Sequence, residues 1–259
     1  MNVLGHGCLT EDDAAKKTLA HVLPLAIFLG LMALVPLLEF LGFVVENDEM
    51  FPWYRHAPEQ WLYPLQVVVC LILIKRYWRS YDFAPFRGML FAAMMGLIGI
   101  LAWILPGYLF SKMNMDEGWW KFFGFTAREG GFDPAQLVSV DSSMYWLLVA
   151  LRFLRMVIVV AIIEEVFWRG FLMRYLLDKD GDYWRQPFGK FSFKTYVFIT
   201  FLFVIVHSPS DYFGAFIYGS IAYWVAVRTK SLAACVLMHS VANLLLGCYV
   251  MFTGEYGYW

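Results

Sequence analysis

Seven side chains in the C-terminal half of the chain are of the types that hydrolysis requires, and they fall into three short motifs. They are Glu164, Glu165 and Arg169; Phe203 and His207; and His239 and Asn243. A carboxylate beside a histidine can hold and deprotonate a water molecule. A second histidine and an amide can donate hydrogen bonds to the oxyanion that forms when water attacks a peptide bond. These residue types therefore predict hydrolysis by activated water.

The spacing within each motif is that of an α-helix, and it suggests which residues pair with each other and which face the same side. Glu165 and Arg169 are four positions apart with the acid first, the favourable order for an ion pair on one helix. Glu164 is rotated from Glu165 by about 100° and has no local partner. Phe203 and His207 share one helix face, as do His239 and Asn243. We expect Glu165 and Arg169 to neutralise each other, while Glu164 faces some other group.

Other hydrolytic chemistries are less well supported by the motifs. The chain contains no G-x-S-x-G, and Ser208, Ser220 and Ser240 belong to no nucleophile motif. The alternative is a zinc ion held by Glu164, His207 and His239, which would leave one open position for a reactive hydroxide. The chain has no H-E-x-x-H, which makes the zinc interpretation weaker. The sequence thus requires no cofactor, and zinc remains the alternative.

The composition places these residues in a membrane protein. Hydrophobic residues make up 61% of the 259 positions, charged residues only 16%, and the mean hydropathy is +0.59. A soluble domain has about a quarter of its residues charged, so a soluble globule is excluded. The net charge of −1 gives no basic surface for nucleic acid.

Apolar blocks of spanning length predict an all-α, polytopic transmembrane helix bundle of seven spans, or eight with an additional interfacial helix. The predicted spans are 21–45, 61–76, 88–110, 144–173, 195–207, 212–227 and 231–252. Residues 1–259 are expected to form a single integral-membrane domain, with the catalytic motifs within 144–250.

The depths of the polar residues agree with one another. At a rise of about 1.5 Å per residue, Glu164 lies roughly 15 Å from the end of its span near Arg174. By the same measure His207 is about 18 Å along the fifth predicted span, and His239 and Asn243 are about 12 and 18 Å along the seventh. Ionisable groups at such depths are costly and mark functional sites. We therefore expect the four to form one buried site that water can reach.

The distribution of basic residues predicts the orientation. With a cytoplasmic N-terminus, the inner segments hold 13 Lys and Arg residues and the outer segments four, as the positive-inside rule favours. In the outer segment Ser111–Ser143, the aromatic residues at 119, 120, 122 and 123 suit an interfacial helix or cap, with an ordinary loop as the alternative.

Two further expectations concern residues outside the motifs. Cys70, Cys235 and Cys248 lie in apolar blocks and are interpreted as small buried hydrophobic residues. Arg152 and Arg155 share a face of the fourth span. They could bind a substrate carboxylate or an anionic headgroup, but we favour pairing with Asp141 or Asp211 near the outer interface.

The three motifs, in this order, resemble those of the CPBP family, the CAAX-protease and bacteriocin-processing enzymes. E-E-x-x-x-R begins at Glu164, F-x-x-x-H at Phe203 and H-x-x-x-N at His239. The resemblance covers residues 144–250 and implies an α-helical intramembrane endopeptidase. In such an enzyme Glu164 and His207 would activate water, and His239 and Asn243 would stabilise the oxyanion. Glu165, Arg169 and Phe203 would support the site.

The resemblance further implies membrane lipid and a membrane-tethered or lipidated peptide as partners, without nucleic acid. It places the protein in a prokaryotic inner membrane. Members of the family are described as either glutamate-dependent or metal-dependent. Two other functions remain open: a non-catalytic membrane scaffold or immunity factor, and a proton-coupled transporter that uses Glu164 and the histidines as a relay.

Overall fold

The computed structural model describes residues 10–44, 55, 58–116, 118–128, 130–131, 133–136 and 138–259, and every regular element within them is helical. Each of the seven predicted spans coincides with a helical segment, although position 45 of the first lies outside the described residues. These segments are α1 Glu11–Met32 with α2 Leu34–Phe40, α4 Glu59–Tyr77, α5 Met89–Met113, a long composite helix over Ser143–Tyr175, α9 Phe193–Ile205, α10 Tyr212–Thr229 and α11 Leu232–Thr253.

Four of the described helices are long and apolar enough to cross a membrane. They are Glu11–Phe40, Met89–Met113, Ser143–Tyr175 and Leu232–Thr253. Helix α9 is apolar but has only 13 residues. The predicted fold class, a polytopic all-α bundle, is confirmed.

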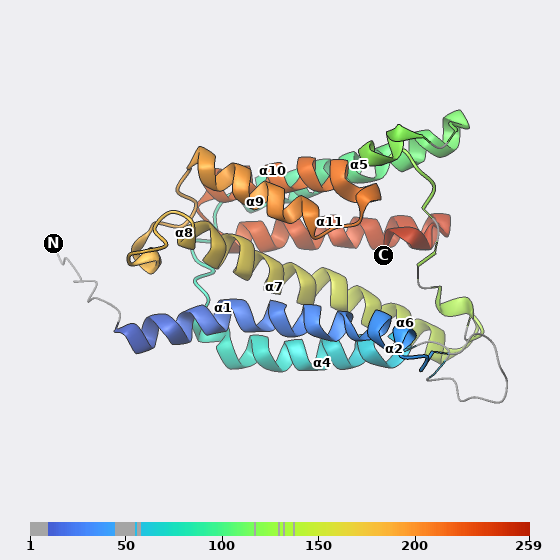
Figure 1. Cartoon of the computed structure of the whole chain (residues 1–259), viewed down its shortest axis with the longest axis horizontal. Helices are drawn as coiled ribbons and strands as arrows, with labels where there is room; N and C mark the ends of the chain where they lie inside the picture. The colour runs from blue at the N-terminus through green and yellow to red at the C-terminus, as the bar shows by residue number, and fades with distance from the viewer. Residues whose placement is uncertain are drawn as a thin grey trace.

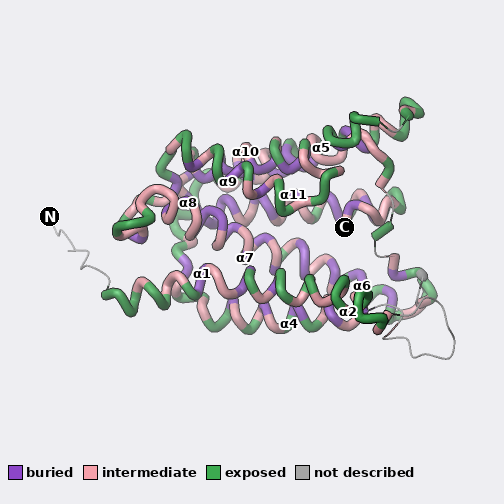
Figure 2. Tube along the Cα trace, in the orientation of Figure 1, coloured by how far each residue is buried: buried purple, intermediate pink, exposed green. Residues whose placement is uncertain are grey.

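The long composite helix occupies the centre of the bundle. In Figure 1, α1 and α4 lie side by side on one flank of this helix, and α5, α9, α10 and α11 lie on the other. Figure 2 shows that buried residues are concentrated on the faces that these helices turn toward one another. The candidate acids Glu164 and Glu165 thus lie on the element that contacts both halves of the bundle.

The central helix departs from α-helical geometry on both sides of those acids. It runs through α6 Ser143–Phe153, the π-helical stretch η4 Leu154–Val160, α7 Ala161–Glu165, a second π-helical stretch η5 Val166–Leu172 and α8 Met173–Tyr175. Wider π turns are rare, and they occur frequently at functional sites. The two stretches change which faces the residues before and after α7 present to neighbouring helices.

Small residues allow the second half of the bundle to pack closely. A Cβ atom added to Gly96 on α5 would clash with the carbonyl oxygen of Met238 on α11. A Cβ on Gly99 would lie 2.8 Å from the ring of Tyr218 on α10. In membranes, where apolar burial drives helix association only weakly, such close backbone approach supplies the packing energy.

Pro24 in α1 leaves a carbonyl free to accept a hydrogen bond from the segment that follows α4. Pro24 has no N–H, so the carbonyl of Ala20 loses its usual helical partner. The hydroxyl of Tyr81, which follows α4, donates to that carbonyl over 3.0 Å. This hydrogen bond joins α1 to the far end of α4.

Two sequence expectations need comment. Cys70 and Cys235 are buried as expected, but Cys248 is exposed because it lies on the outward face of α11. The outer aromatic segment contains the short 3-10 helix η2 Trp119–Phe123, in which Trp119 and Trp120 stack with ring centroids 3.8 Å apart. The large aromatic side chains of η2 are exposed, as an interfacial position requires.

Candidate functional site

Glu165 accepts hydrogen bonds from two other side chains in a buried polar cluster. Its Oε1 accepts hydrogen bonds from Arg169 Nη1 and from His239 Nδ1, each over 2.9 Å. Glu165 and Arg169 are both 1% exposed, and the predicted ion pair between them is present. The guanidinium of Arg169 also lies 5.5 Å from the ring centroid of Phe203, so the three motifs are joined physically.

Glu164 takes a different direction from its neighbour. It borders a cavity of about 220 Å³ that is also lined by His207, His239 and Asn243. Within the described residues Glu164 has neither an ion-pair nor a hydrogen-bond partner, unlike Glu165. Side chains from the central helix, the end of α9 and α11 therefore meet at one cavity.

His207 is positioned by the end of its helix. Pro209 forces Ser208 into extended backbone (φ −68°, ψ 153°), so α9 stops just before the histidine. The carbonyl of Phe203 then lacks its helical partner, and His207 Nδ1 bonds it over 2.6 Å. A carbonyl can only accept, so Nδ1 carries the proton and Nε2 is left as the basic nitrogen.

His239 and Asn243 lie one turn apart on α11. Because Nδ1 of His239 donates to the Glu165 carboxylate, Nε2 is again the atom available to a reactant. Asn243 Nδ2 donates one hydrogen to the carbonyl of Met156 over 2.7 Å. Its second amide hydrogen is available at the cavity that Asn243 borders.

Three residues at the cavity were not among the predicted site residues. Tyr218 is 4% exposed, its hydroxyl has no hydrogen-bond partner within the described residues, and its ring lies edge-on to that of His239. Trp103 lies edge-on to His207 with centroids 5.2 Å apart and donates its Nε1–H to Asp211 over 2.9 Å. No sequence motif includes Trp103 on α5, Tyr218 on α10 or Asp211, which directly precedes α10. Only their polarity in or beside apolar segments could have indicated them.

We expected Arg152 and Arg155 to pair with Asp141 or Asp211. This prediction is wrong for Arg155 and for Asp211, whose recorded partners are other residues. Asp211 accepts instead from Arg128 Nη1 over 2.5 Å. Arg155 donates its Nε to Gln66 Oε1 over 2.6 Å. The reason is geometric: the arginines lie on the face of the central helix that packs against α4 and α1, away from Asp211 on the α10 side.

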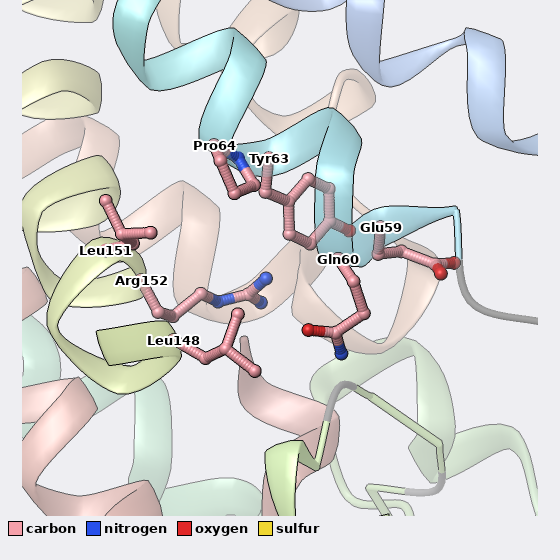
Figure 3. A pocket seen from close by; sticks show the side chains of 7 residues that line it. All are labelled: Glu59, Gln60, Tyr63, Pro64, Leu148, Leu151 and Arg152. Carbon is pink, nitrogen blue, oxygen red and sulfur yellow. The ribbon is translucent and has the colours of Figure 1, made fainter. Parts of the chain in front are cut away.

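Figure 3 shows the environment of Arg152. Its guanidinium points toward the ring of Tyr63 on α4, with a centroid distance of 5.0 Å, and the side chains of Glu59 and Gln60 lie nearby. The arginine also lies 5.3 Å from the ring centroid of Trp259. Aromatic faces and a nearby carboxylate stabilise this buried charge.

A larger, half-open groove adjoins the cavity. Its volume is about 680 Å³, and most of its wall is apolar side chains of α1, the central helix and α9. Its polar lining consists of Arg152, Arg155, Glu164 and His207. Because Glu164 and His207 border both spaces, the groove and the cavity meet at these two side chains.

The described side chains do not match a three-ligand zinc site. Glu164, His207 and His239 border one cavity, yet within the described part of the chain no three His, Cys, Asp or Glu side chains group closely enough to hold a metal ion.

The fold and the site together define a polytopic helical membrane protein in which Glu, His, His and Asn side chains line one internal cavity. Residues 146–245 match a family model described as Type II CAAX prenyl endopeptidase Rce1-like. The match confirms the resemblance to the CAAX-protease family over the segment that contains all three motifs, and it supports a protease. No curated protein matches the chain, and no solved structure does.

Proposed function

We propose that the protein is an intramembrane endopeptidase that hydrolyses a peptide bond with water activated by Glu164 and His207. The observation that carries this proposal is the shared cavity. Glu164, His207, His239 and Asn243 come from three separate helical segments and line one space of about 220 Å³. That volume holds several water molecules or a short stretch of peptide.

Water activation follows from the environments of the first two residues. Within the described residues the Glu164 carboxylate forms no ion pair within 4 Å, so it accepts a proton from a bound water. His207 holds the same water through Nε2, because Nδ1 is fixed on Phe203. The water oxygen then attacks the carbonyl carbon, and the proton moves to Glu164.

We assign stabilisation of the oxyanion to three other side chains that line the cavity. Asn243 offers its second Nδ2 hydrogen. His239 donates from Nε2 when it is protonated, and the Glu165 carboxylate at Nδ1 balances the resulting charge. The buried hydroxyl of Tyr218 supplies a third donor. Preorganised donors of this kind contribute most of the rate in many acyl-transfer sites.

The remaining step is collapse of the tetrahedral intermediate. The carbon–nitrogen bond breaks, the proton held by Glu164 passes to the leaving amine, and the products are a carboxylate and an amine. Arg169 and Phe203 take no part in bond making. They hold Glu165 and His207 in place.

The half-open apolar groove suits a membrane-tethered or lipidated peptide, since its lining is compatible with acyl or prenyl chains. We further propose a single catalytic domain over the whole chain, a cytoplasmic N-terminus and a prokaryotic inner-membrane location. The 13 to 4 distribution of basic residues supports the orientation. Reporter fusions at the loop between α1 and α4 and at the loop between α8 and α9 would test it by appearing on opposite sides.

The test of the proposed function is peptide cleavage by purified protein in detergent or vesicles. Membrane-tethered and prenylated peptides are incubated with wild type, Glu164→Gln, and the control Glu39→Gln, which changes an exposed acid outside the cavity. Mass spectrometry should find products with wild type and the control but not with Glu164→Gln. Equal cleavage by all three would overturn the assignment of Glu164.

A further inference from the structure

A largely buried ion pair joins two loops beside the cavity. Arg128, in the segment between η2 and α6, donates its Nη1 to Asp211 Oδ1 over 2.5 Å, and the two side chains are 5% and 20% exposed. Asp211 is the last residue of the short 3-10 helix η7 Pro209–Asp211 and borders the cavity together with Glu164 and His207. The pair therefore lies next to the residues that we assign to water activation, although the three sequence motifs include neither of its members.

Both oxygens of the Asp211 carboxylate accept hydrogen bonds from groups that adjoin His207. Oδ1 also accepts Trp103 Nε1 over 2.9 Å, and Oδ2 accepts the hydroxyl of Ser208 over 2.6 Å. Ser208 directly follows His207 in the chain, and the Trp103 ring lies edge-on to the His207 ring with centroids 5.2 Å apart. One carboxylate therefore holds both the residue after His207 and the ring that packs against it.

Arg128 makes further contacts with the same turn. Its Nη1 also donates to the hydroxyl of Ser210 over 3.0 Å, and its Nη2 donates to the carbonyl of Ser210 over 2.9 Å. On its other side, the guanidinium carbon lies 4.5 Å from the ring centroid of Tyr258, which borders the cavity. A guanidinium presents several donors in one rigid plane, so it can hold a loop in a single conformation.

His207 depends on this support because it lies beyond the end of its helix. Helix α9 ends at Ile205, and the backbone N–H of His207 makes a turn-type hydrogen bond to the carbonyl of Val204 over 3.1 Å. The direction in which Nε2 points is therefore determined by the conformation of the turn that follows α9. The Arg128–Asp211 pair fixes that turn.

Arg128 also affects the charge at the cavity. Asp211 and Glu164 both border this space, and carboxylates that share a site repel each other. The guanidinium of Arg128 neutralises Asp211, and both Asp211 oxygens are occupied by hydrogen-bond donors. Glu164 is thereby left as the carboxylate that can take up a proton from water.

We propose that Arg128 is a positioning residue for His207: through Asp211 it holds the turn after α9, so that His207 Nε2 points at the water beside Glu164. This inference rests on the proposed function and adds to it a residue that lies before the segment 146–245 matched by the family model. Arg128 is not among the residues that line the cavity, so it acts on the reaction through Asp211 and not by touching the substrate.

The first test separates kcat from KM. Arg128→Gln removes the charge and should lower kcat by about 10- to 100-fold with KM changed by less than about threefold, because a small misplacement of a catalytic group costs that much. Arg128→Lys keeps the charge and should restore kcat to within about fivefold of wild type. The matched control Arg185→Gln breaks an exposed ion pair with Asp182 and should retain the wild-type kcat. An unchanged kcat in Arg128→Gln would overturn the proposal.

A double variant tests whether Arg128 acts through Asp211. Asp211→Asn alone should resemble Arg128→Gln, and the double variant should lose no more than about twofold beyond the less active single variant, since residues that act as a unit are not additive. Losses that multiply would show that the two residues act separately. Complete inactivity of Asp211→Asn beside wild-type activity of Arg128→Gln would place Asp211 in the reaction itself. Either result would overturn the positioning role.

Hydrogen exchange measured by mass spectrometry tests the same turn without turnover. The amides of Val206, His207 and Asp211 are hydrogen bonded, so their exchange reports opening of the turn. In Arg128→Gln they should exchange about tenfold faster while α11 keeps its wild-type rate, because the opening is local. If Arg128→Gln fails to fold, exchange rises throughout the chain, and Ser208→Ala replaces it as the test. That variant removes only an exposed hydroxyl that bonds Asp211 and should give the same local increase.

The two measurements separate this proposal from the proposed function. If wild type cleaves no peptide, the endopeptidase assignment fails, and exchange still decides whether Arg128 holds the turn. If wild type cleaves and the turn opens in Arg128→Gln without a fall in kcat, the endopeptidase stands and the positioning role is wrong. Wild-type exchange at the turn in both Arg128→Gln and Ser208→Ala would also overturn the proposal.

Discussion

His239 donates its Nδ1–H to Glu165 Oε1 over 2.9 Å, and the same oxygen accepts Arg169 Nη1 over 2.9 Å. One carboxylate oxygen thus fixes a histidine from α11 and neutralises an arginine on its own helix. All three side chains are buried. The consequence is that the reactive atom of His239 is Nε2, and that a carboxylate lies beside the ring where positive charge would develop during the reaction.

Replacement of Glu165 by glutamine should reduce catalysis without removing it. The amide oxygen of the substituted side chain can still accept from Nδ1, but it no longer balances the charge of a protonated His239. We expect kcat to fall by about 10- to 100-fold, a typical effect when the group that supports a catalytic histidine is changed. Steady-state kinetics with Glu164 intact would measure it. A Glu165→Gln enzyme with wild-type kcat would show that the charge of Glu165 is unimportant to the reaction.

The Glu165–Arg169 pair should behave as a buried ion pair in stability measurements. Glu165→Ala leaves the arginine charge unpaired in the bundle and should destabilise the protein by about 3–5 kcal/mol. The double variant Glu165→Leu/Arg169→Met removes both charges and should recover most of the thermal stability while remaining inactive. Thermal unfolding in detergent tests this. A double variant less stable than Glu165→Ala would contradict it.

Asn243 and Tyr218, the two uncharged hydrogen-bond donors at the cavity, should stabilise the transition state of the reaction. Asn243→Ala removes one oxyanion donor and should lower kcat by about 10²- to 10³-fold with little change in KM. Tyr218→Phe removes only the buried hydroxyl, which has no partner among the described residues, and should reduce kcat without loss of stability. Thermal stability measured alongside kcat provides the control. A Tyr218→Phe variant with unchanged kcat would remove the hydroxyl from the mechanism.

Packing of α5 against α11 should depend on the small residue at position 96. Gly96→Leu forces a side chain into the space beside the Met238 carbonyl, so we expect a large drop in melting temperature. Gly30→Ala is the matched control, because no atom lies within 4 Å of a Cβ at position 30 and alanine favours the helix. The account of the bundle would fail if the two variants were equally stable.

The sequence indicates much of the fold and the core of the candidate site. Six of the seven apolar blocks predict the bounds of their helical segments to within about three residues, because hydrocarbon thickness sets their length. The first helix begins at Glu11, about ten residues before the predicted span, because its first turns are polar and lie outside the apolar block. The i, i+4 spacing predicts the Glu165–Arg169 pair, and equal depths predict that Glu164, His207 and His239 share a cavity.

Contacts between helices distant in sequence could not be predicted in the same way. No spacing rule links Arg155 to Gln66 on α4, or Asp211 to Trp103 on α5. Tyr218 lies on α10 together with Ser220 and Tyr223, so its hydroxyl alone does not distinguish it from residues that serve only packing. Helix rotation in the bundle determines these contacts, and the π-helical stretches of the central helix change that rotation locally.

The most direct test of the central claim measures kcat/KM for Glu164→Gln, His207→Ala and the double variant, with and without chelator. If both residues activate one water, each single variant should lose at least about 10³-fold, and the double variant should lose little more, because residues that act as a unit are not additive. Wild-type activity should survive the chelator, since the described side chains form no three-ligand metal group. Retention of activity within about fivefold by Glu164→Gln, or loss of wild-type activity on chelation, would contradict the account.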